Sequence, residues 1–357
     1  MRTIKDMARV LAKDLSFSQK YNYIKYSLSP RSEVLGYDPV TISIVATSRC
    51  TLSCDMCPTH SARIPKTYPY IQDSTCDMTL EMFRRIIDRY YNAIAVQIIG
   101  SGEPMLNKDF FGMVDYAVSR KMTVKTFSNG TTVAANIDAI LASGLQGITV
   151  SLNGHNAQEF KRMTGMPEKT YYDVYDATKR LIQERNRKSS PVRVKLSYII
   201  DKQNYIFMPE MAKVSAELGA DFTFFCNFLA CPYEGFTADE RSLETGEAIT
   251  KEIQGFIRSL PLSQRRKFDF PQLIDRNAKR FSCRSHFSQI RFDGAGNVSS
   301  CSMMLLDMGK KGNFMDPDAW NNEFFRSMRR GFLSGERSAL HDPCLWCPDN
   351  VGVTPWE

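Results

Sequence analysis

The sequence predicts an α/β fold built on mostly parallel strands. Segments rich in β-branched residues alternate with helical segments in six units over residues 41–235. Such alternation is typical of parallel strands joined by crossover helices. Six units are too few for a closed eight-stranded barrel, so an open partial barrel and a doubly wound sheet both fit. In either arrangement, functional side chains are expected at the carboxyl ends of the strands.

The elements follow in a regular order along the chain. The expected strands span 41–47, 94–99, 122–127, 147–152, 192–200 and 221–228. The helices between them are expected at 79–91, 108–119, 133–143, 170–186 and 205–218. Thr79 is suited to cap the first of these helices, with Glu81 in its first turn. Gly144 and Gly219 stand where two of the helices should end.

Composition and charge narrow the class of protein. The chain has 357 residues, of which 43% are apolar and 24% charged, as in an ordinary protein with a sizeable core. No run of 18 apolar residues occurs, so we expect no membrane span. The first residues lack the apolar core of a signal peptide, which predicts a cytoplasmic protein. The net charge of +7 is mild, and we expect no nucleic-acid partner.

Four regions are expected. Residues 1–40 form a helical extension, 41–235 the α/β region, 236–282 a helical connector, and 283–357 a small C-terminal module. The last region is rich in glycine and contains four of the ten cysteines. Its own core looks too small for independent stability, so a metal centre is expected to stabilise a loop-rich module.

The first cysteine cluster follows the first strand directly. Cys50, Cys54 and Cys57 have the spacing C-x3-C-x2-C. A fully ligated iron–sulfur cluster normally takes four cysteines. Three ligands leave one iron open to hold a chelating ligand and pass it an electron. The alternative is a zinc site with His60 as fourth ligand.

This loop resembles the signature of the radical S-adenosylmethionine (SAM) superfamily. Further segments at strand ends extend the resemblance: GSGEP at 100–104 is similar to the family's GGEP segment, FSNGT at 127–131 to its TNG segment, and VSLNG at 150–154 follows the fourth strand. The resemblance implies an open partial (β/α)6 TIM-like barrel. It also implies a [4Fe–4S] cluster on the three cysteines, which cleaves SAM to a 5′-deoxyadenosyl radical.

The resemblance also implies SAM contacts at individual residues. Glu103 would accept a hydrogen bond from the methionine ammonium of SAM, and Met56 stands where the family often has an aromatic near the adenine. The full set of implied contacts is Met56, Gly102, Glu103, Pro104, Ser128, Asn129, Ser151 and Asn153. The other interpretation of the serines and asparagines is strand-end turn chemistry. Relatives often carry aspartate at the position of Asn153, and Arg162 stands where many carry a basic residue, although a solvated helix face also explains it.

A second set of four cysteines lies in the C-terminal module. Cys283, Cys301, Cys344 and Cys347 are separated by 17, 42 and 2 residues, and a hairpin-like segment precedes Cys301. Four cysteines suit either zinc or a fully ligated iron–sulfur cluster. The pattern resembles the twitch module, the short form of the SPASM extension found in radical SAM dehydrogenases of the aminoglycoside-cyclitol type. That resemblance implies one auxiliary [4Fe–4S] cluster, since no cysteine follows Cys347.

Three cysteines remain: Cys76, Cys226 and Cys231. Free cysteine is often buried, so core packing is one explanation for each. Cys226 and Cys231 lie at or just beyond the sixth strand, at the expected active-site mouth. A thiol there would donate a hydrogen atom to a substrate radical in an epimerase.

Three functions from different classes follow. The first is oxidation of a small, sugar- or cyclitol-like substrate, with the auxiliary cluster as electron acceptor. The second is modification or epimerisation of a peptide. Many radical SAM enzymes of that kind carry an N-terminal peptide-binding domain, and the roughly forty residues before the first strand are too few for one. The third is a non-catalytic zinc-binding module. The segment 258–284 contains eight Lys and Arg residues. It is either a solvated connector, or a surface that binds an acidic partner such as a reducing flavodoxin or ferredoxin, or one that binds a phosphorylated substrate.

Overall fold

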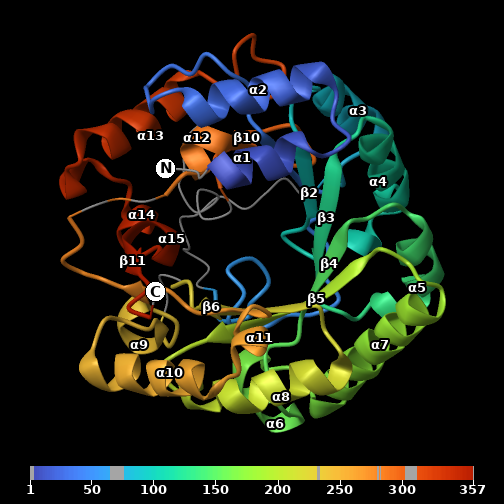
Figure 1. Ribbon diagram of the computed structural model, residues 1–357, viewed down its shortest axis with the longest axis vertical. Coiled ribbons are helices and arrows are strands. Elements are labelled where there is room, and N and C mark those ends of the chain that lie inside the picture. The colour runs from blue at the N-terminus through green and yellow to red at the C-terminus, as the bar shows by residue number, and fades with distance from the viewer. Residues whose placement is uncertain are drawn as a thin grey trace.

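Strands line the inside and helices the outside of the fold in the computed structural model (Figure 1). The structure describes residues 4–64, 76–230, 234–279, 281, 283–301 and 312–356. The central sheet has nine strands in the order β10-β9-β1-β2-β3-β4-β5-β6-β7, so it is open, with β10 and β7 at its edges. An open, mostly parallel α/β sheet is the predicted fold class.

The six predicted strands are present and pair in sequence order. They are β1 (Thr41–Val45), β2 (Ala95–Ile99), β3 (Thr123–Ser128), β4 (Gly147–Ser151), β5 (Arg193–Ile200) and β6 (Phe222–Asn227). Each pairs in parallel with the next. Their carboxyl ends therefore meet at one rim, where the predicted site residues lie.

Helices cover the outer face of this sheet (Figure 1). The predicted helices are α3 (Leu80–Arg89), α4 (Phe110–Ser119), α5 (Val133–Ala142), α7 (Glu168–Arg187) and α8 (Met208–Leu218), the last preceded by η2 (Tyr205–Phe207). Thr79 caps α3 by accepting a hydrogen bond from the backbone of Met82 at 3.1 Å. Gly219 ends α8 with φ of 75°, in the left-handed region that glycine adopts without strain.

Several elements were missed by the sequence analysis. Helix α6 (Ala157–Thr164) lies between β4 and α7. Strands β7 (Phe268–Asp269), β9 (Gln289–Phe292) and β10 (Val298–Ser299) extend the sheet at both edges. The hairpin of β9 and β10 before Cys301 was expected, but its place in this sheet was not. Strand β9 pairs in parallel with β1 and buries Ile290 and Phe292 completely. The C-terminal region therefore contributes strands to the barrel sheet.

Shorter elements complete the chain. The N-terminal extension holds α1 (Ile4–Leu11) and α2 (Phe17–Leu28), and the connector holds α9 (Ala238–Arg241), α10 (Glu247–Ser259) and α11 (Leu262–Arg265). The C-terminal region contains more helix than expected: α12 (Ser285–Ser288), α13 (Glu323–Ser334), α14 (Asp342–Leu345) and α15 (Pro348–Val351). The remaining elements are η1 (Pro104–Leu106), η4 (Arg337–Ala339) and the pair β8 (Leu273–Ile274) and β11 (Gly352–Val353). Among the described residues, no helix is both long and apolar enough to cross a membrane.

The two faces of the sheet differ in character. Outward-facing side chains such as Ile98, Val124 and Leu196 are buried beneath the helices. Side chains on the inner face are more accessible, and Phe127 remains 42% exposed. Because successive side chains of a strand alternate between faces, every second residue of each strand lies on the inner face.

Candidate active site

The three cysteines of the first cluster lie together on the loop that follows β1. The backbone N–H of Cys57 donates to the carbonyl of Cys54 at 2.9 Å, which closes a tight turn. Burial and, to a smaller extent, the neighbouring thiols of Cys57 and Cys50 together raise the pKa of the Cys54 thiol to about 12. Burial also raises the pKa of Cys50. The fold thus brings the three predicted ligands close enough to influence one another.

The surroundings of these thiols suit a sulfur-ligated cluster. Cys50 Sγ accepts hydrogen bonds from the backbone of Leu52 at 3.5 Å and from Asn129 Nδ2 at 3.4 Å. Cys57 Sγ lies 3.2 Å from Thr59 Oγ1. Hydrogen bonds to sulfur are one means by which proteins tune iron–sulfur clusters. Metal or cluster binding requires the deprotonated thiolates, so binding at these cysteines would release their protons.

The zinc alternative rests on His60, whose Nε2 is buried without a hydrogen-bond partner in the described part of the chain. Within the described ranges, no three His, Cys, Asp or Glu side chains are grouped so as to hold a single metal ion.

The segment 100–104 packs against the backbone of the cysteine loop. A Cβ on Gly102 would lie 1.8 Å from the carbonyl oxygen of Arg49, so only glycine fits. The backbone N–H of Glu103 donates to the same oxygen at 2.8 Å. Pro104 is buried at the start of η1. Gly102, one of the expected SAM contacts, therefore also allows the close approach of these two backbone segments.

Glu103 is fully buried at the end of β2 and joins two strand ends. Its carboxylate accepts hydrogen bonds from Ser128 Oγ at 3.0 Å, the backbone of Asn129 at 2.7 Å and Thr132 Oγ1 at 2.9 Å. Burial raises the pKa of Glu103, and these donors act in the opposite direction. Ser128 and Asn129, which were predicted as SAM contacts, therefore donate hydrogen bonds to Glu103. Thr132 is a third donor to this carboxylate that was not predicted.

We expect the Glu103→Gln variant to bind SAM more weakly. The carboxamide lacks the charge that attracts an ammonium, and a charged hydrogen bond contributes about 1.5–3 kcal/mol. Its NH2 group also meets donors where the carboxylate accepts, so stability should fall by about 1–3 kcal/mol. Calorimetric titration with SAM and urea unfolding measure the two effects. Glu81→Gln, on the exposed surface of α3, is the control. Unchanged SAM affinity in folded Glu103→Gln would remove this residue from the site.

The remaining predicted SAM contacts lie along the same rim. Ser151 ends β4, opposite Ser197 of β5. Asn153 is buried with φ of 47°, and its Oδ1 accepts a hydrogen bond from the backbone of Ile199 at 3.2 Å. Met56 packs against the buried pair Phe228 and Phe236 beyond β6. Asn153 thus links β4 to β5, and Met56 places the cysteine loop over the end of β6.

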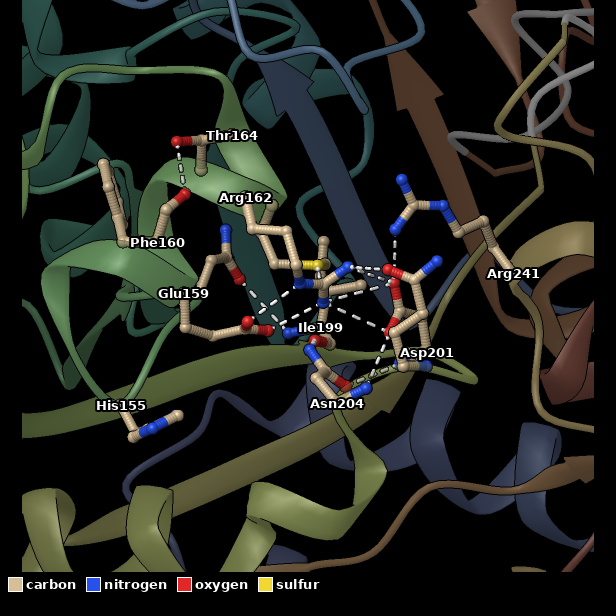
Figure 2. Close-up of polar contacts among 12 residues, drawn as sticks. His155, Glu159, Phe160, Arg162, Thr164, Ile199, Asp201, Asn204 and Arg241 are labelled. Atoms are coloured by element: carbon tan, nitrogen blue, oxygen red, sulfur yellow. Dashed lines mark hydrogen bonds and ion pairs between the residues drawn. The ribbon is translucent and has the colours of Figure 1, made fainter.

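Arg162 belongs to a charged network rather than to a solvated helix face (Figure 2). Its guanidinium pairs with Glu159 at 2.7 Å and with Asp201 at 3.3 Å. Asp201, just after β5, is completely buried and also pairs with Arg241 at 2.6 Å. Asn204 donates its backbone N–H to Asp201 at 3.0 Å. The network joins α6, the end of β5 and α9.

This network continues into the cysteine loop through the end of α6. The backbone N–H of Asp55 donates to the carbonyl of Thr164 at 2.9 Å. Gly165 follows with φ of 72°, and a Cβ there would lie 2.8 Å from the carboxyl carbon of Asp55. Asp55 also pairs with Arg63 at 2.9 Å. The buried charges therefore support the rim that carries the cysteines.

The four C-terminal cysteines are neighbours as well. Asn350 joins three of them: its Oδ1 accepts from the backbone of Cys283 at 3.5 Å, its Nδ2 donates to the carbonyl of Cys344 at 2.9 Å, and its N–H donates to the carbonyl of Cys347 at 2.9 Å. Burial raises the pKa of Cys347, and the nearby Asp349, Cys283 and Cys301 raise it further. Cys301 follows the hairpin of β9 and β10, as the sequence predicted.

The remaining cysteines differ in their surroundings. Cys76 and Cys226 are exposed, so core packing is the wrong explanation for both. Cys226 lies on the inner face of β6, 3.9 Å from Ser197 Oγ. The protein around it raises the pKa of its thiol to about 11, which keeps the hydrogen on sulfur at neutral pH. Cys231 lies outside the described residues.

Comparison with known proteins agrees with this geometry. The family model of the radical SAM superfamily matches residues 44–204. The chain is 27% identical over 184 residues to the mycofactocin maturase MftC of Mycolicibacterium smegmatis, covering 51% of this chain and 43% of that protein. It is 23% identical over 191 residues to the PqqA peptide cyclase of Granulibacter bethesdensis, covering 53% and 47%. The matched region thus spans less than half the length of these two relatives.

A solved structure shows the same fold. The crystal structure of Streptococcus suis SuiB bound to S-adenosylmethionine matches with a TM-score of 0.61 at 15% sequence identity, covering 92% of this chain and 71% of that one. The family model spans β1 to the end of β5 and includes the cysteine loop, Glu103 and the rim residues around it. Through residues 44–204, the chain belongs to the radical SAM superfamily.

Proposed function

We propose that this chain is a radical SAM oxidoreductase that binds one [4Fe–4S] cluster at Cys50, Cys54 and Cys57 and oxidises a small-molecule substrate. The observation that carries the proposal is that the three half-buried thiols and the buried Glu103 lie at one rim of the barrel. When bound there, the cluster supplies the electron that splits SAM into methionine and a 5′-deoxyadenosyl radical. Hydrogen abstraction from a substrate on the inner face of the barrel follows.

The chain's own residues have distinct tasks in this proposal. Glu103 supplies the charge that attracts the SAM ammonium, while Ser128 and Thr132 hold its carboxylate. Asn129 touches both Cys50 Sγ and Thr51 Oγ1, so it links the SAM side of the rim to the cluster ligands. Gly102 lets the loop approach closely enough for these contacts.

The oxidative step is assigned to the C-terminal cysteines. A substrate radical formed by loss of a hydrogen atom must lose one more electron, and one proton to a base, to become an oxidised product. Cys283, Cys301, Cys344 and Cys347 provide four thiols, the full ligand set of a second [4Fe–4S] cluster. Such a cluster has no open iron for substrate, so electron transfer is the chemistry that its ligand set supports. The exposed basic segment around Arg258 and Arg266 is the proposed docking surface for a flavodoxin or ferredoxin.

Peptide modification is the second candidate. It is favoured by the names of two relatives, a mycofactocin maturase and a PqqA peptide cyclase. The exposed Cys226 thiol on the inner face would serve as hydrogen donor if the reaction were an epimerisation. Anaerobic incubation with SAM, a reductant and either host metabolites or host peptides, followed by mass spectrometry, separates the two substrate classes.

We expect the variant Cys344→Ala, Cys347→Ala to retain SAM cleavage but to form little oxidised product. The first cluster has its own ligands on the barrel, whereas the second set loses two of its four thiols. The measurement is 5′-deoxyadenosine against oxidised product in excess reductant.

Folding is the confounding factor, because metal binding and folding are coupled in small metal modules. Thermal melting and the iron content at the first site must therefore match those of the wild-type protein. The milder Cys344→Ser variant keeps the size of the side chain and serves as the second test. Oxidised product at the wild-type rate in a well-folded variant would show that the second set is structural.

A further inference from the structure

Three basic side chains lie side by side on the inner face of the barrel. Lys125 of β3 is in register with Gly147 of β4, which is in register with Arg193 of β5. Lys195 stands in the next layer, in register with Thr149. Residues in register on parallel strands face the same side. Because Gly147 has no side chain, nothing on β4 separates Lys125 from Arg193.

This face is accessible. Lys125 and Arg193 are exposed, whereas Val124 and Val194, their neighbours on the same strands, are buried beneath the helices. Ser151 lies two and four residues beyond Thr149 and Gly147 on β4. The alternation of a strand therefore places Ser151, a predicted SAM contact, on the same face as the three basic residues.

Within the residues that the structure describes, Lys125, Arg193 and Lys195 make no ion pair. The ammonium of Lys195 lies instead over the rings of Phe222 and Phe224, 5.8 and 5.5 Å from their centres. Asp221, whose charge favours the ammonium of Lys195, already pairs with Arg185 and accepts the backbone N–H of Val194.

The basic residues also repel one another. Burial lowers the pKa of Lys125, and the charges of Lys195, Lys13 and Arg193 lower it further. Burial and Arg193 likewise lower the pKa of Lys195. A lowered lysine pKa means that the charged form is less favourable in the folded protein than in the unfolded chain. The two lysine charges therefore do not stabilise the fold, and unfavourable charge of this kind is common at functional sites.

We propose that Lys125, Arg193 and Lys195 form an anion subsite at the floor of the barrel, which binds a phosphate or carboxylate group of the substrate. The inference rests on the proposed function and specifies its substrate, which carries a negative charge and is long enough to extend from these residues toward the rim. Lys125 of β3 lies four residues before Asn129, which directly follows the strand, so the two are roughly 13 Å apart along the strand direction. A substrate with an anionic group at the floor would thus extend toward the rim where SAM is expected to bind.

The test is calorimetric titration of the iron-loaded enzyme with pyrophosphate at constant ionic strength, with and without SAM. We expect saturable binding that persists when SAM is present. The variant Lys125→Gln, Lys195→Gln should bind the probe at least about a hundredfold more weakly, from two lost charged hydrogen bonds at about tenfold or more each. The variant Lys179→Gln, Lys213→Gln removes two exposed lysines from the outer helices and should bind as the wild type does.

Melting temperature is the second measurement. Because the cluster is self-repelling, Lys125→Gln, Lys195→Gln should melt at or above the wild-type temperature, and pyrophosphate should raise the melting temperature of the wild type only. Equal pyrophosphate affinity in the two double variants, competition between pyrophosphate and SAM, or absence of binding would each overturn the subsite. These outcomes are separate from the proposed function, which is tested by whether the wild type forms 5′-deoxyadenosine and an oxidised small-molecule product.

Discussion

Replacing Cys50, Cys54 and Cys57 together with alanine is expected to abolish SAM cleavage. The three thiols are the ligands assigned to the cluster that reduces SAM, and no other side chain of the loop replaces a thiolate as a sulfur ligand. About half of the iron of the reconstituted protein should be lost, because two four-iron sites are expected and one would remain. Iron analysis and anaerobic assay of 5′-deoxyadenosine measure both quantities.

Cys76→Ala is the matched control, since Cys76 is an exposed cysteine outside both sets. It should retain the iron content and the SAM cleavage of the wild type. Wild-type cleavage in the triple variant would contradict the assignment of the cluster. Zinc in place of iron in the purified wild-type protein would instead support the alternative that involves His60, whose Nε2 is buried without a partner among the described residues.

Much of the fold could be predicted because it depends on local patterns. Alternating β-branched and helical segments define six parallel strands, and helix ends carry their own signals, such as the Thr79 cap and Gly219. The extra strands could not be predicted in the same way. Strand β9 has four residues and β7 and β10 have two each, so none carries a readable period, and each exists only because a sheet edge accepts its backbone hydrogen bonds.

The candidate site was predicted as a set of residues but not as a set of contacts. The motifs point to Glu103, Ser128 and Asn129, yet sequence spacing does not show that the last two donate hydrogen bonds to the first. Likewise, sequence spacing does not show that Gly102 packs against the backbone of Arg49. Such contacts join strand ends far apart in the chain, and they follow from the register of the sheet.

The role of Arg162 shows the same limit. On a helix of eight residues, a basic side chain in the last turn is most simply explained as solvated. Its partner Asp201 lies 39 residues further along the chain. Arg241, the other arginine that pairs with Asp201, lies 40 residues beyond Asp201. A signal existed in Glu159, three residues before Arg162, because this spacing places the two side chains together on a helix.

We expect Asp201→Ala to be the most destabilising substitution of a charged residue at the rim. Asp201 is completely buried between Arg162 and Arg241, and it also accepts the backbone N–H groups of Gln203 and Asn204. Removing one partner of a buried ion pair leaves uncompensated charge and costs about 3–5 kcal/mol. Urea unfolding of the iron-loaded protein should show a loss of that size in the free energy of unfolding.

Asp173→Ala tests whether burial of the ion pair is the cause of the large loss of stability expected for Asp201→Ala. Asp173 pairs with Lys169 at 2.7 Å, but both side chains are exposed, and such pairs contribute about 1 kcal/mol or less. If Asp201→Ala unfolds the protein altogether, Asp201→Asn keeps one oxygen for the two backbone donors and isolates the loss of charge. Because α6 contacts the cysteine loop through Thr164 and Asp55, SAM cleavage should fall with stability in the Asp201 variants and stay unchanged in Asp173→Ala. Equal losses of stability in Asp201→Ala and Asp173→Ala would mean that the buried network does not support the rim.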